Sequence, residues 1–466
     1  MLEQLLPIDL PAGFVNNGTK YLARRRWYAG NLVRWSGKTL QPVGGWTQRS
    51  LSAALNGSPS GATALTAGFS TQGRIMVGAG AALYVVEGTT VTTITPAILS
   101  GAALTNVYWQ ITTFGTVVII TYLPTRSLFF WDSAVGGLAT LFTGPLGAAN
   151  GEATVTTPER FLFAFVDRTV YWPSQEGYTD WTPTAQNTAG DFPLETSGTL
   201  VCGRATRGGT LIWTTADLWL ATYIGGVLVY AFAKVGDACG PVSVHAPVMI
   251  GTTAYWMGHG RFYRCDGYVQ TIPCDVEDYV FSNITSSRTY KIWGLANPRF
   301  GEVTWFYPSA NATECDSYVT FAYEQGHWTF GTLARATGIP AQVNATPPVP
   351  VLFGTDGLLY DHETGNARTG ATVYAESGPV ELGDGDQLMR IQRIVPDDKT
   401  LGDVSASLIT AMYPDAAETT NGPYTLVNPT SVRLTARQVR LKITEAAASA
   451  WRVGVPRLGV LPGGRR

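Results

Sequence analysis

The chain has 466 residues, of which 14% are charged and 11% are aromatic. This length exceeds what one compact core usually reaches, so we expect one large repeat-built domain or two to three domains. Charged residues are rarer than the ~25% typical of soluble domains. Partners that cover much of the surface explain this, and so does a neutral-surfaced monomer. The apolar fraction of 45% excludes a disordered chain.

The net charge of −2 is unevenly distributed. Residues 1–50 carry seven Lys and Arg against two Asp and Glu, and residues 433–466 carry eight against one. The rest of the chain therefore has a net charge of −14. Both ends of the chain are basic and its middle is acidic. Such a charge distribution bears on the partners of a protein and says little about its fold.

The five cysteines are scattered, and neither they nor the four histidines have the spacing of metal ligands. This pattern is typical of free thiols in a reducing compartment. The N-terminal stretch has no basic segment before its apolar residues, and prolines interrupt it, so we expect no secretion signal. No apolar run approaches the ~18 residues of a membrane-spanning segment. We therefore expect a soluble protein that is assembled in the cytoplasm.

The first distinctive motif is a run of cationic and aromatic residues: Arg24, Arg25, Arg26, Trp27, Tyr28, Arg34 and Trp35. Such residues offer charge and stacking planes to a nucleic-acid strand. A general DNA-binding domain is basic over one face, however, whereas the middle of this chain is acidic. Arg, Trp and Tyr are also enriched at interface hot spots. We predict an assembly interface here, with a solvated charge run beside a strand as the alternative.

An apolar–aromatic pair that follows a turn recurs seven times in short β-rich runs. The second members of the pairs are separated by 41 to 54 residues: Tyr84, Phe130, Tyr171, Trp219, Tyr263, Phe306 and Tyr360. A period in the forties made of short strands is typical of four-stranded propeller blades. We predict an all-β fold with a β-propeller of six to seven blades over residues 51–371. An array of β-sandwiches is the alternative.

Helical signal is scarce: only segment 274–284, with Asp275 as a possible N-cap, predicts a short helix. From about Thr372 the apolar residues alternate as in exposed antiparallel strands. Within 431–444 the alternation changes phase, which indicates a bulge or a second strand. We predict that residues 372–466 form an additional antiparallel β-module, completed by an N-terminal arm, residues 1–50, that also includes the first strands.

No catalytic motif stands out. Acidic residues cluster at 275–278, at Asp384 and Asp386, and at Asp397 and Asp398. None of these clusters has the frame of a glycosidase pair or a calcium loop. A helix start and tight turns explain them better. Because GxSxG, P-loop and HExxH motifs are also absent from the sequence, we expect no enzyme activity, no cofactor and no metal ion.

The stretch LPAGFVNNGTKYLARRRWYAGNLVRWSGKTLQPVGGW, residues 10–46, resembles the opening of tail proteins from double-stranded DNA phages. The phrases GRFYRCDGYVQTIPCDVEDYVF, GEVTWFYPS, YEQGHWTFGTLAR and WRVGVPRLGV are similar as well. The family that the chain resembles is the tail nozzle or tail hub of short-tailed phages, also described as packaged-DNA stabilisation proteins. The resemblance extends over nearly the whole chain.

The resemblance implies a β-propeller subunit that assembles into a ring, typically of six copies, below the portal and adaptor proteins. Such a ring extends the DNA channel and retains packaged DNA until ejection. The implied neighbours are tail fibre, spike or needle proteins. Double-stranded DNA passes through the channel without sequence-specific binding, and the implied location is the tail of the virion. A glycan-binding or glycan-hydrolysing β-propeller is the alternative function.

Overall fold

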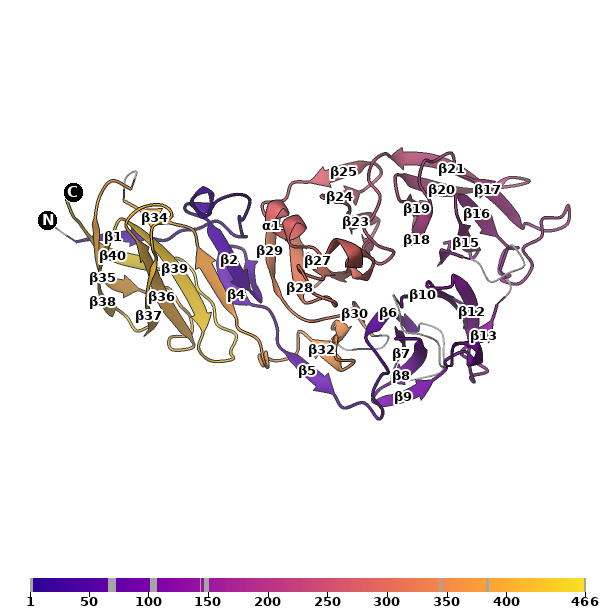
Figure 1. Cartoon of the computed structure of the whole chain (residues 1–466), viewed down its shortest axis with the longest axis horizontal. Coiled ribbons are helices and arrows are strands. Elements are labelled where there is room, and N and C mark those ends of the chain that lie inside the picture. The colour runs from indigo at the N-terminus through magenta and orange to yellow at the C-terminus, as the bar shows by residue number, and fades with distance from the viewer. Residues whose placement is uncertain are drawn as a thin grey trace.

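The structure is a computed structural model that describes residues 3–65, 73–100, 107–142, 144–145, 151–342, 345, 347–382 and 385–464. The chain forms a β-propeller and a two-sheet β-module beside it (Figure 1). Strands from both halves of the sequence enter both bodies. The predicted all-β fold, a propeller with an additional antiparallel module, is therefore confirmed.

Seven four-stranded antiparallel sheets are the blades that the described residues form, within the predicted range of six to seven. In chain order the first six are β6 (Pro59–Leu65), β7 (Arg74–Ala79), β8 (Ala82–Glu87) and β9 (Thr90–Thr93); β10 (Trp109–Phe114), β11 (Val117–Tyr122), β12 (Ser127–Asp132) and β13 (Thr140–Leu141); β14 (Ala153–Thr156), β15 (Leu162–Val166), β16 (Thr169–Trp172) and β17 (Gly190–Pro193); β18 (Leu200–Thr206), β19 (Gly209–Thr214), β20 (Leu218–Gly225) and β21 (Val229–Gly236); β22 (Val248–Ile250), β23 (Thr253–Met257), β24 (Phe262–Cys265) and β25 (Val269–Ile272); β26 (Trp293–Asn297), β27 (Glu302–Tyr307), β28 (Ser317–Ala322) and β29 (His327–Thr332). The first strand of a blade lies beside the first strand of the next, as β6 does beside β10.

Each blade contains one of the seven apolar–aromatic pairs. Six pairs lie on the third strand of their blade, and the pair at 305–306 lies on the second strand, β27. The first members of the pairs share complete burial, with 0% exposure: Leu83, Phe129, Val170, Leu218, Phe262, Trp305 and Leu359. A blade must cover its sheet face against a neighbouring blade. The first member of each recurring pair is therefore a side chain buried in the propeller core.

The seventh blade combines strands from two distant parts of the chain. Strands β30 (Thr337–Ile339), β31 (Val351–Phe353) and β32 (Leu359–His362) are joined at the outer edge by β5 (Trp46–Arg49). Arg49 supports this pairing, since its guanidinium binds both carboxylate oxygens of Asp361 at 2.7 and 2.5 Å. Strand β5 lies inside the predicted N-terminal arm, so part of that arm belongs to the propeller.

The module consists of two antiparallel sheets. The first contains β1 (Gln4–Pro7), β40 (Arg457–Pro462), β35 (Met389–Val395) and β38 (Thr430–Ala436). The second contains β2 (Trp27–Asn31), β33 (Tyr374–Ser377), β39 (Gln438–Glu445), β36 (Val404–Ala411), β37 (Thr419–Thr425) and the short β34 (Val380–Glu381). The phase change within 431–444 therefore separates two strands, β38 and β39, which belong to different sheets.

The predicted helix is confirmed as α1 (Glu277–Ser282), the only α-helix in the described part of the chain. The prediction of Asp275 as the N-cap is wrong. The N-cap position is occupied by Val276, whose side chain makes no capping hydrogen bond. Asn17 from the N-terminal arm instead accepts a hydrogen bond from the backbone N–H of Asp278 at 3.0 Å. The remaining helical turns are 3-10 turns at η1 (Lys20–Ala23), η2 (Ala97–Leu99) and η3 (Ser286–Lys291).

The five cysteines are free thiols, and four of them are buried. Nowhere in the described part of the chain does a helix have the length and apolar character that a membrane crossing requires.

A buried histidine in the closing blade makes stability depend on pH. His362 lies against Trp46, with ring centroids 5.3 Å apart, and its Nε2 accepts a hydrogen bond from Arg335 Nε at 2.9 Å. Burial, with help from the Arg335 charge, lowers the His362 pKa well below its usual value. The native ring thus stays neutral while the unfolded chain binds a proton below about pH 6.5, so this residue's contribution to stability is lost as the pH falls.

We expect His362→Gln to reduce the loss of stability on acidification. Glutamine still accepts the Arg335 hydrogen bond but does not titrate, which removes up to ~1.4 kcal/mol per pH unit of pH dependence. Urea unfolding at pH 7, 6 and 5 measures this slope. His259→Gln, at an exposed position, is the matched control. Equal slopes for wild type and His362→Gln would contradict the prediction.

Candidate assembly site at the junction of propeller and module

The propeller axis carries almost no charge. Among the seven innermost strands, β6, β10, β14, β18, β22, β26 and β30, the one charged residue is Arg204. In the described residues there is also no group of three His, Cys, Asp or Glu side chains placed to hold a metal ion. The acidic charge of the propeller therefore lies on its loops and outer strands.

Local contacts explain the acidic clusters that the sequence singled out. Asp275 forms an ion pair with Arg26 at 3.4 Å. Asp397 accepts a hydrogen bond from Val455 N at 2.7 Å, and Asp398 accepts one from Thr400 N at 2.8 Å. Asp384 lies outside the described residues. The clusters thus serve an ion pair and turns.

A cleft of about 670 Å³ lies beside the junction and has aromatic walls that include Tyr279, Phe330 and Tyr374. Its one acidic lining residue is Asp316, whose carboxylate accepts a hydrogen bond from Ser309 Oγ at 2.6 Å. Glycoside hydrolysis ordinarily needs two carboxyl groups that face each other across the bond that breaks. The lining residues of this cleft do not supply that pair.

The N-terminal arm builds the junction from aromatic residues. Trp35 packs edge-on against Phe14, with ring centroids 5.3 Å apart, and lies 6.1 Å from Trp27. Phe14 in turn packs against Phe330 of β29 at 5.2 Å. Strand β2 can lie this close because position 30 is glycine: a Cβ atom there would lie 2.4 Å from the Phe14 ring. The cores of the module and of the adjoining blades are therefore continuous.

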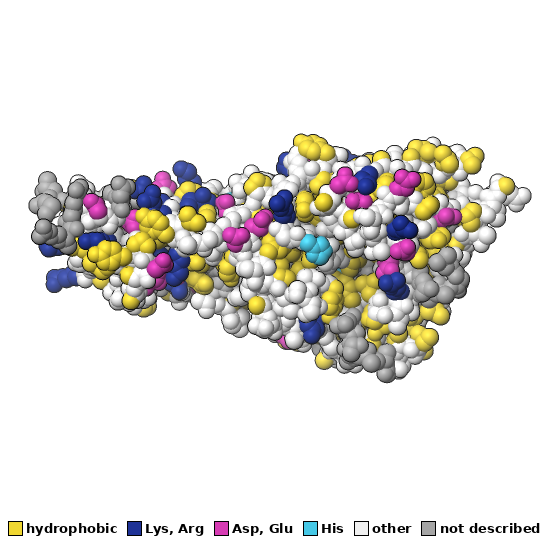
Figure 2. Space-filling model, turned by 45° about the horizontal axis from the view of Figure 1, so that its top comes forward, with side chains coloured by type: hydrophobic (Ala, Val, Ile, Leu, Met, Phe, Trp, Pro, Cys, Tyr) yellow, Lys and Arg dark blue, Asp and Glu magenta, His cyan; other side chains and the backbone are white. Residues whose placement is uncertain are grey.

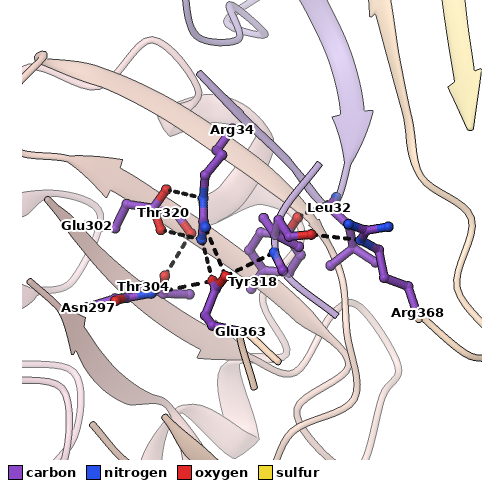
Figure 3. Close-up of polar contacts among 11 residues, drawn as sticks. Leu32, Arg34, Asn297, Glu302, Thr304, Tyr318, Thr320, Glu363 and Arg368 are labelled. Carbon is purple, nitrogen blue, oxygen red and sulfur yellow. Dashed lines mark hydrogen bonds and ion pairs between the residues drawn. The ribbon is translucent and has the colours of Figure 1, made fainter. Parts of the chain in front are cut away.

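Arg34 occupies the centre of the junction on the short hairpin of β3 (Val33–Ser36) and β4 (Thr39–Pro42) (Figure 3). Its guanidinium donates two hydrogen bonds of 2.9 Å to the Glu302 carboxylate and bonds of 3.0 and 2.5 Å to Glu363. It also lies 3.7 Å above the Phe300 ring. Glu302 belongs to β27 and Glu363 follows β32, so Arg34 joins two blades to the arm.

The pKa shifts reflect burial of one cation between two anions. Burial alone would lower the Arg34 pKa, but Glu302 and Glu363 outweigh it and raise the pKa. Burial raises the Glu302 pKa although Arg34 opposes this shift. Gly44 N and Asn297 Nδ2 lie within hydrogen-bond distance of Glu363, at 2.9 and 3.5 Å. The buried carboxylates of Glu302 and Glu363 therefore rely on these hydrogen-bond donors to replace the water that they lose.

A second buried cation connects this cluster to the module. Arg368 donates from Nε to Val43 O at 2.7 Å and from Nη1 to Glu445 at 2.7 Å. The same Glu445 oxygen accepts a hydrogen bond from Trp451 Nε1 at 3.0 Å. Charged groups thus bridge the two bodies from β27 in the propeller to β39 in the module.

Three residues of the predicted assembly interface need correction. Trp27, Arg34 and Trp35 are only 4%, 5% and 5% exposed, since they form the core of the junction. They are consequently anchors within one chain and not exposed contacts for another subunit. The prediction was wrong for them because their partners, such as Glu302 and Glu363 for Arg34 and His327 for Trp35, are remote in sequence.

The other four predicted residues lie at or near the surface. Arg24 and Arg25 are exposed, and Arg26 and Tyr28 are half-buried. Arg24 lies 3.9 Å from the Glu381 carboxylate, and the backbone N–H of Arg25 donates to Pro379 O at 3.2 Å. Tyr28 lines a pocket of the module, and Arg24 and Arg25 adjoin this pocket through Tyr21 and Pro379, whereas Arg26 pairs with Asp275.

We call this the arm pocket. It has a volume of about 420 Å³ and is lined chiefly by residues of the arm, of β36 and of the loop that follows it: Gly18, Thr19, Lys20, Tyr21, Tyr28, Pro379, Ile409, Ala411, Tyr413, Pro414, Asp415, Ala416, Glu418, Gln438 and Arg440. Glu418 binds both Lys20, at 3.5 Å, and Arg440, at 2.6 Å. The pocket therefore combines apolar rings with paired charges and has exposed arginines beside it.

Sequence reasoning missed Glu302, Glu363, Arg368 and Glu445. The one signal for Glu302 is a charged residue at the start of an apolar run, GEVTWFYP. That signal does not distinguish a buried ion pair from a strand end in solvent.

We expect Arg34→Met to destabilise the protein by about 3–5 kcal/mol, because two buried carboxylates lose their cation. Denaturant unfolding, followed by tryptophan fluorescence, measures the loss. Arg160→Met is the matched control, since Arg160 pairs with Glu176 at 68% and 59% side-chain exposure and such pairs contribute under about 1 kcal/mol. Similar losses in both variants would refute the central role of Arg34.

No protein-family model matches the sequence, and no curated protein matches it. Among solved structures, streptogramin B lyase is 8% identical with a TM-score of 0.44, covering 68% of this chain and 96% of that one. The β-propeller domain of Swd1 (Cps50) from Myceliophteria thermophila is 9% identical with a TM-score of 0.42, covering 68% and 99%. The extracellular domain of the hybrid two-component system BT3049 from B. thetaiotaomicron is 8% identical with a TM-score of 0.46, covering 92% and 61%. The likeness is one of fold alone.

Proposed function

We propose that the chain is a structural subunit of a phage tail that assembles into a ring, the nozzle or hub, which extends the DNA channel and retains packaged DNA until ejection. One observation carries this proposal. The two phrases that most specifically resemble tail proteins, residues 10–46 and 451–460, contribute the junction residues Arg34 and Trp451. The resemblance therefore coincides with the part of the chain that makes one rigid subunit from two bodies.

The charge distribution supports assembly into a ring. The module, taken as residues 1–45 and 372–466, carries 17 Lys and Arg against 12 Asp and Glu, a net charge of +5. The propeller, residues 46–371, carries 15 against 22, a net charge of −7. Opposite charges on the two bodies favour contact between the module of one copy and the propeller of the next. Such a head-to-tail contact closes into a ring when its rotation permits.

The glycan-binding or glycan-hydrolysing alternative has less support. Stacking on sugar rings needs exposed aromatic faces. The blade aromatics Phe306 and Trp219 are only 3% and 7% exposed, so a sugar platform would have to come from other residues such as Tyr268, which is 63% exposed. The junction cleft contributes one carboxylate where hydrolysis needs two.

The experiment that tests the proposal is a mass measurement of the purified protein, alone and mixed with a portal–adaptor assembly. We expect a discrete ring, six copies being implied by the resemblance, bound at the adaptor in the mixture. A protein that ignores this assembly and binds or hydrolyses surface polysaccharide would overturn the proposal in favour of the glycan function.

We expect Arg24→Glu/Arg25→Glu to leave a folded monomer and to weaken ring formation or docking at least tenfold. Both side chains are exposed, so reversing their charge changes the surface beside the arm pocket. Analytical ultracentrifugation with the portal–adaptor assembly measures the effect. Arg126→Glu/Arg207→Glu, a double charge reversal at exposed propeller positions, is the control. Equal assembly by the two variants would contradict the prediction.

A further inference from the structure

The hairpin of β20 and β21 ends in an exposed apolar tip. We call residues 224–228, with the sequence IGGVL, the hairpin tip. Ile224 is 54% exposed, Leu228 is 71% exposed and Val227 is 100% exposed. Single exposed aliphatic residues are ordinary, but three at the end of one projecting hairpin form a patch that a partner would cover favourably.

The conformation of the tip is fixed by its own backbone and by its base. Gly225 and Gly226 turn the chain with φ values of 69° and 67°, and Val229 has a φ of 58°, which a β-branched residue rarely adopts. At the base, Tyr230 packs against Phe163, with ring centroids 4.7 Å apart, and its Oη lies 2.9 Å from Thr157 Oγ1. A patch held this firmly loses little conformational entropy when it binds.

The charges near the tip argue against a membrane as its partner. Residues 208–233 contain no Lys or Arg, and their one charged residue, Asp217, is buried and paired with Lys234 at 3.4 Å. Asp191 and Glu195 are exposed on or beside the neighbouring strand β17, where Phe192 stacks on Phe232 of β21 at 4.7 Å. Anionic lipid surfaces attract clusters of basic residues. These surroundings suit an apolar protein surface with basic residues at its rim.

The arm pocket offers apolar walls, and its charged lining residues are of both signs: Lys20, Asp415, Glu418 and Arg440. Eight of its lining residues supply apolar or aromatic surface: Tyr21, Tyr28, Pro379, Ile409, Ala411, Tyr413, Pro414 and Ala416. The exposed Arg24 and Arg25 lie beside it, and Figure 2 shows Lys and Arg side chains gathered over the module. Its volume of about 420 Å³ accommodates small aliphatic side chains such as those of Val227 and Leu228.

The positions of the two features exclude a contact within one chain. Figure 1 places β20 and β21 on the side of the propeller away from the module, whereas the arm pocket is built on the module. A contact between different surfaces of two copies leaves one free tip and one free pocket, so further copies add until a ring closes, when the rotation between copies permits closure.

We propose that the hairpin tip of one copy inserts into the arm pocket of a second copy of this chain. This inference rests on the proposed function, because it specifies the contact between copies from which the proposed ring is built. Apolar contact between Val227 and Leu228 and the pocket supplies the binding, and the acidic surroundings of the tip meet Arg24 and Arg25 at the rim.

Cysteine cross-linking between two distinguishable copies tests the contact. Full-length Val227→Cys protein with a mass tag is mixed with untagged Tyr413→Cys protein and oxidised; Tyr413 lines the pocket and is 56% exposed. We expect at least five times more disulfide-linked heterodimer than with Val427→Cys, whose position on the module is outside the pocket and 54% exposed. Equal yields with the pocket and control partners would overturn the inference.

A second variant separates this inference from the proposed function. Val227→Asp/Leu228→Asp alters exposed residues only, so circular dichroism should show wild-type melting. We expect tenfold weaker association in sedimentation with the portal–adaptor assembly. If this variant forms rings as well as wild type does, the hairpin contact is refuted while the nozzle function stands. If the Val227→Cys and Tyr413→Cys proteins cross-link through the pocket but wild type never joins the portal–adaptor assembly, the contact stands and the nozzle function fails.

Discussion

The buried guanidinium of Arg34 between Glu302 and Glu363 is the interaction on which the rest of the structure depends. Two carboxylates and one cation are removed from water here, and this arrangement is favourable only when every hydrogen bond is made. Its members come from the arm, from β27 and from the end of β32. If the seventh blade were open, or if the arm lay elsewhere, Arg34 would be separated from Glu302 or Glu363. A buried charge would then be unpaired. The cluster thus selects one arrangement of arm and blades more than it adds stability.

The aromatic packing around this cluster has a complementary role. Phe14, Trp27 and Trp35 supply the apolar burial that ion pairs alone do not, and they place the module core next to the core of the blades. Arg368 then continues the polar contacts to Glu445. Closure of the propeller and attachment of the module are therefore one event, because the same segment, 10–49, is required for both. Pairing residues this distant in sequence has a high entropic cost during folding. We therefore regard closure of the propeller by its seventh blade as a late folding step.

Features that depend on local sequence could be predicted. Leu83 and its six equivalents recur at the blade period because each blade repeats the same burial requirement, and the phase change before β39 follows from the two-residue period of strands. The interface prediction was less successful. Arg34 and Trp35 have the composition of a hot spot, but Arg34 is buried against Glu302 and Glu363, which are 268 and 329 residues away, and Trp35 packs against His327. One sequence contains no signal for pairings of that separation.

The chain crosses between the two bodies twice. It enters the propeller through the segment between β4 and β5 and returns through the segment between β32 and β33. Two covalent connections, with a buried ion pair between Arg368 and Glu445 beside them, leave no single hinge about which the module could swing. The chain thus behaves as a lever of fixed angle. In the ring that we propose, any widening of the channel would come from tilting whole subunits against one another, and a small tilt at the propeller would become a larger displacement at the far end of the module.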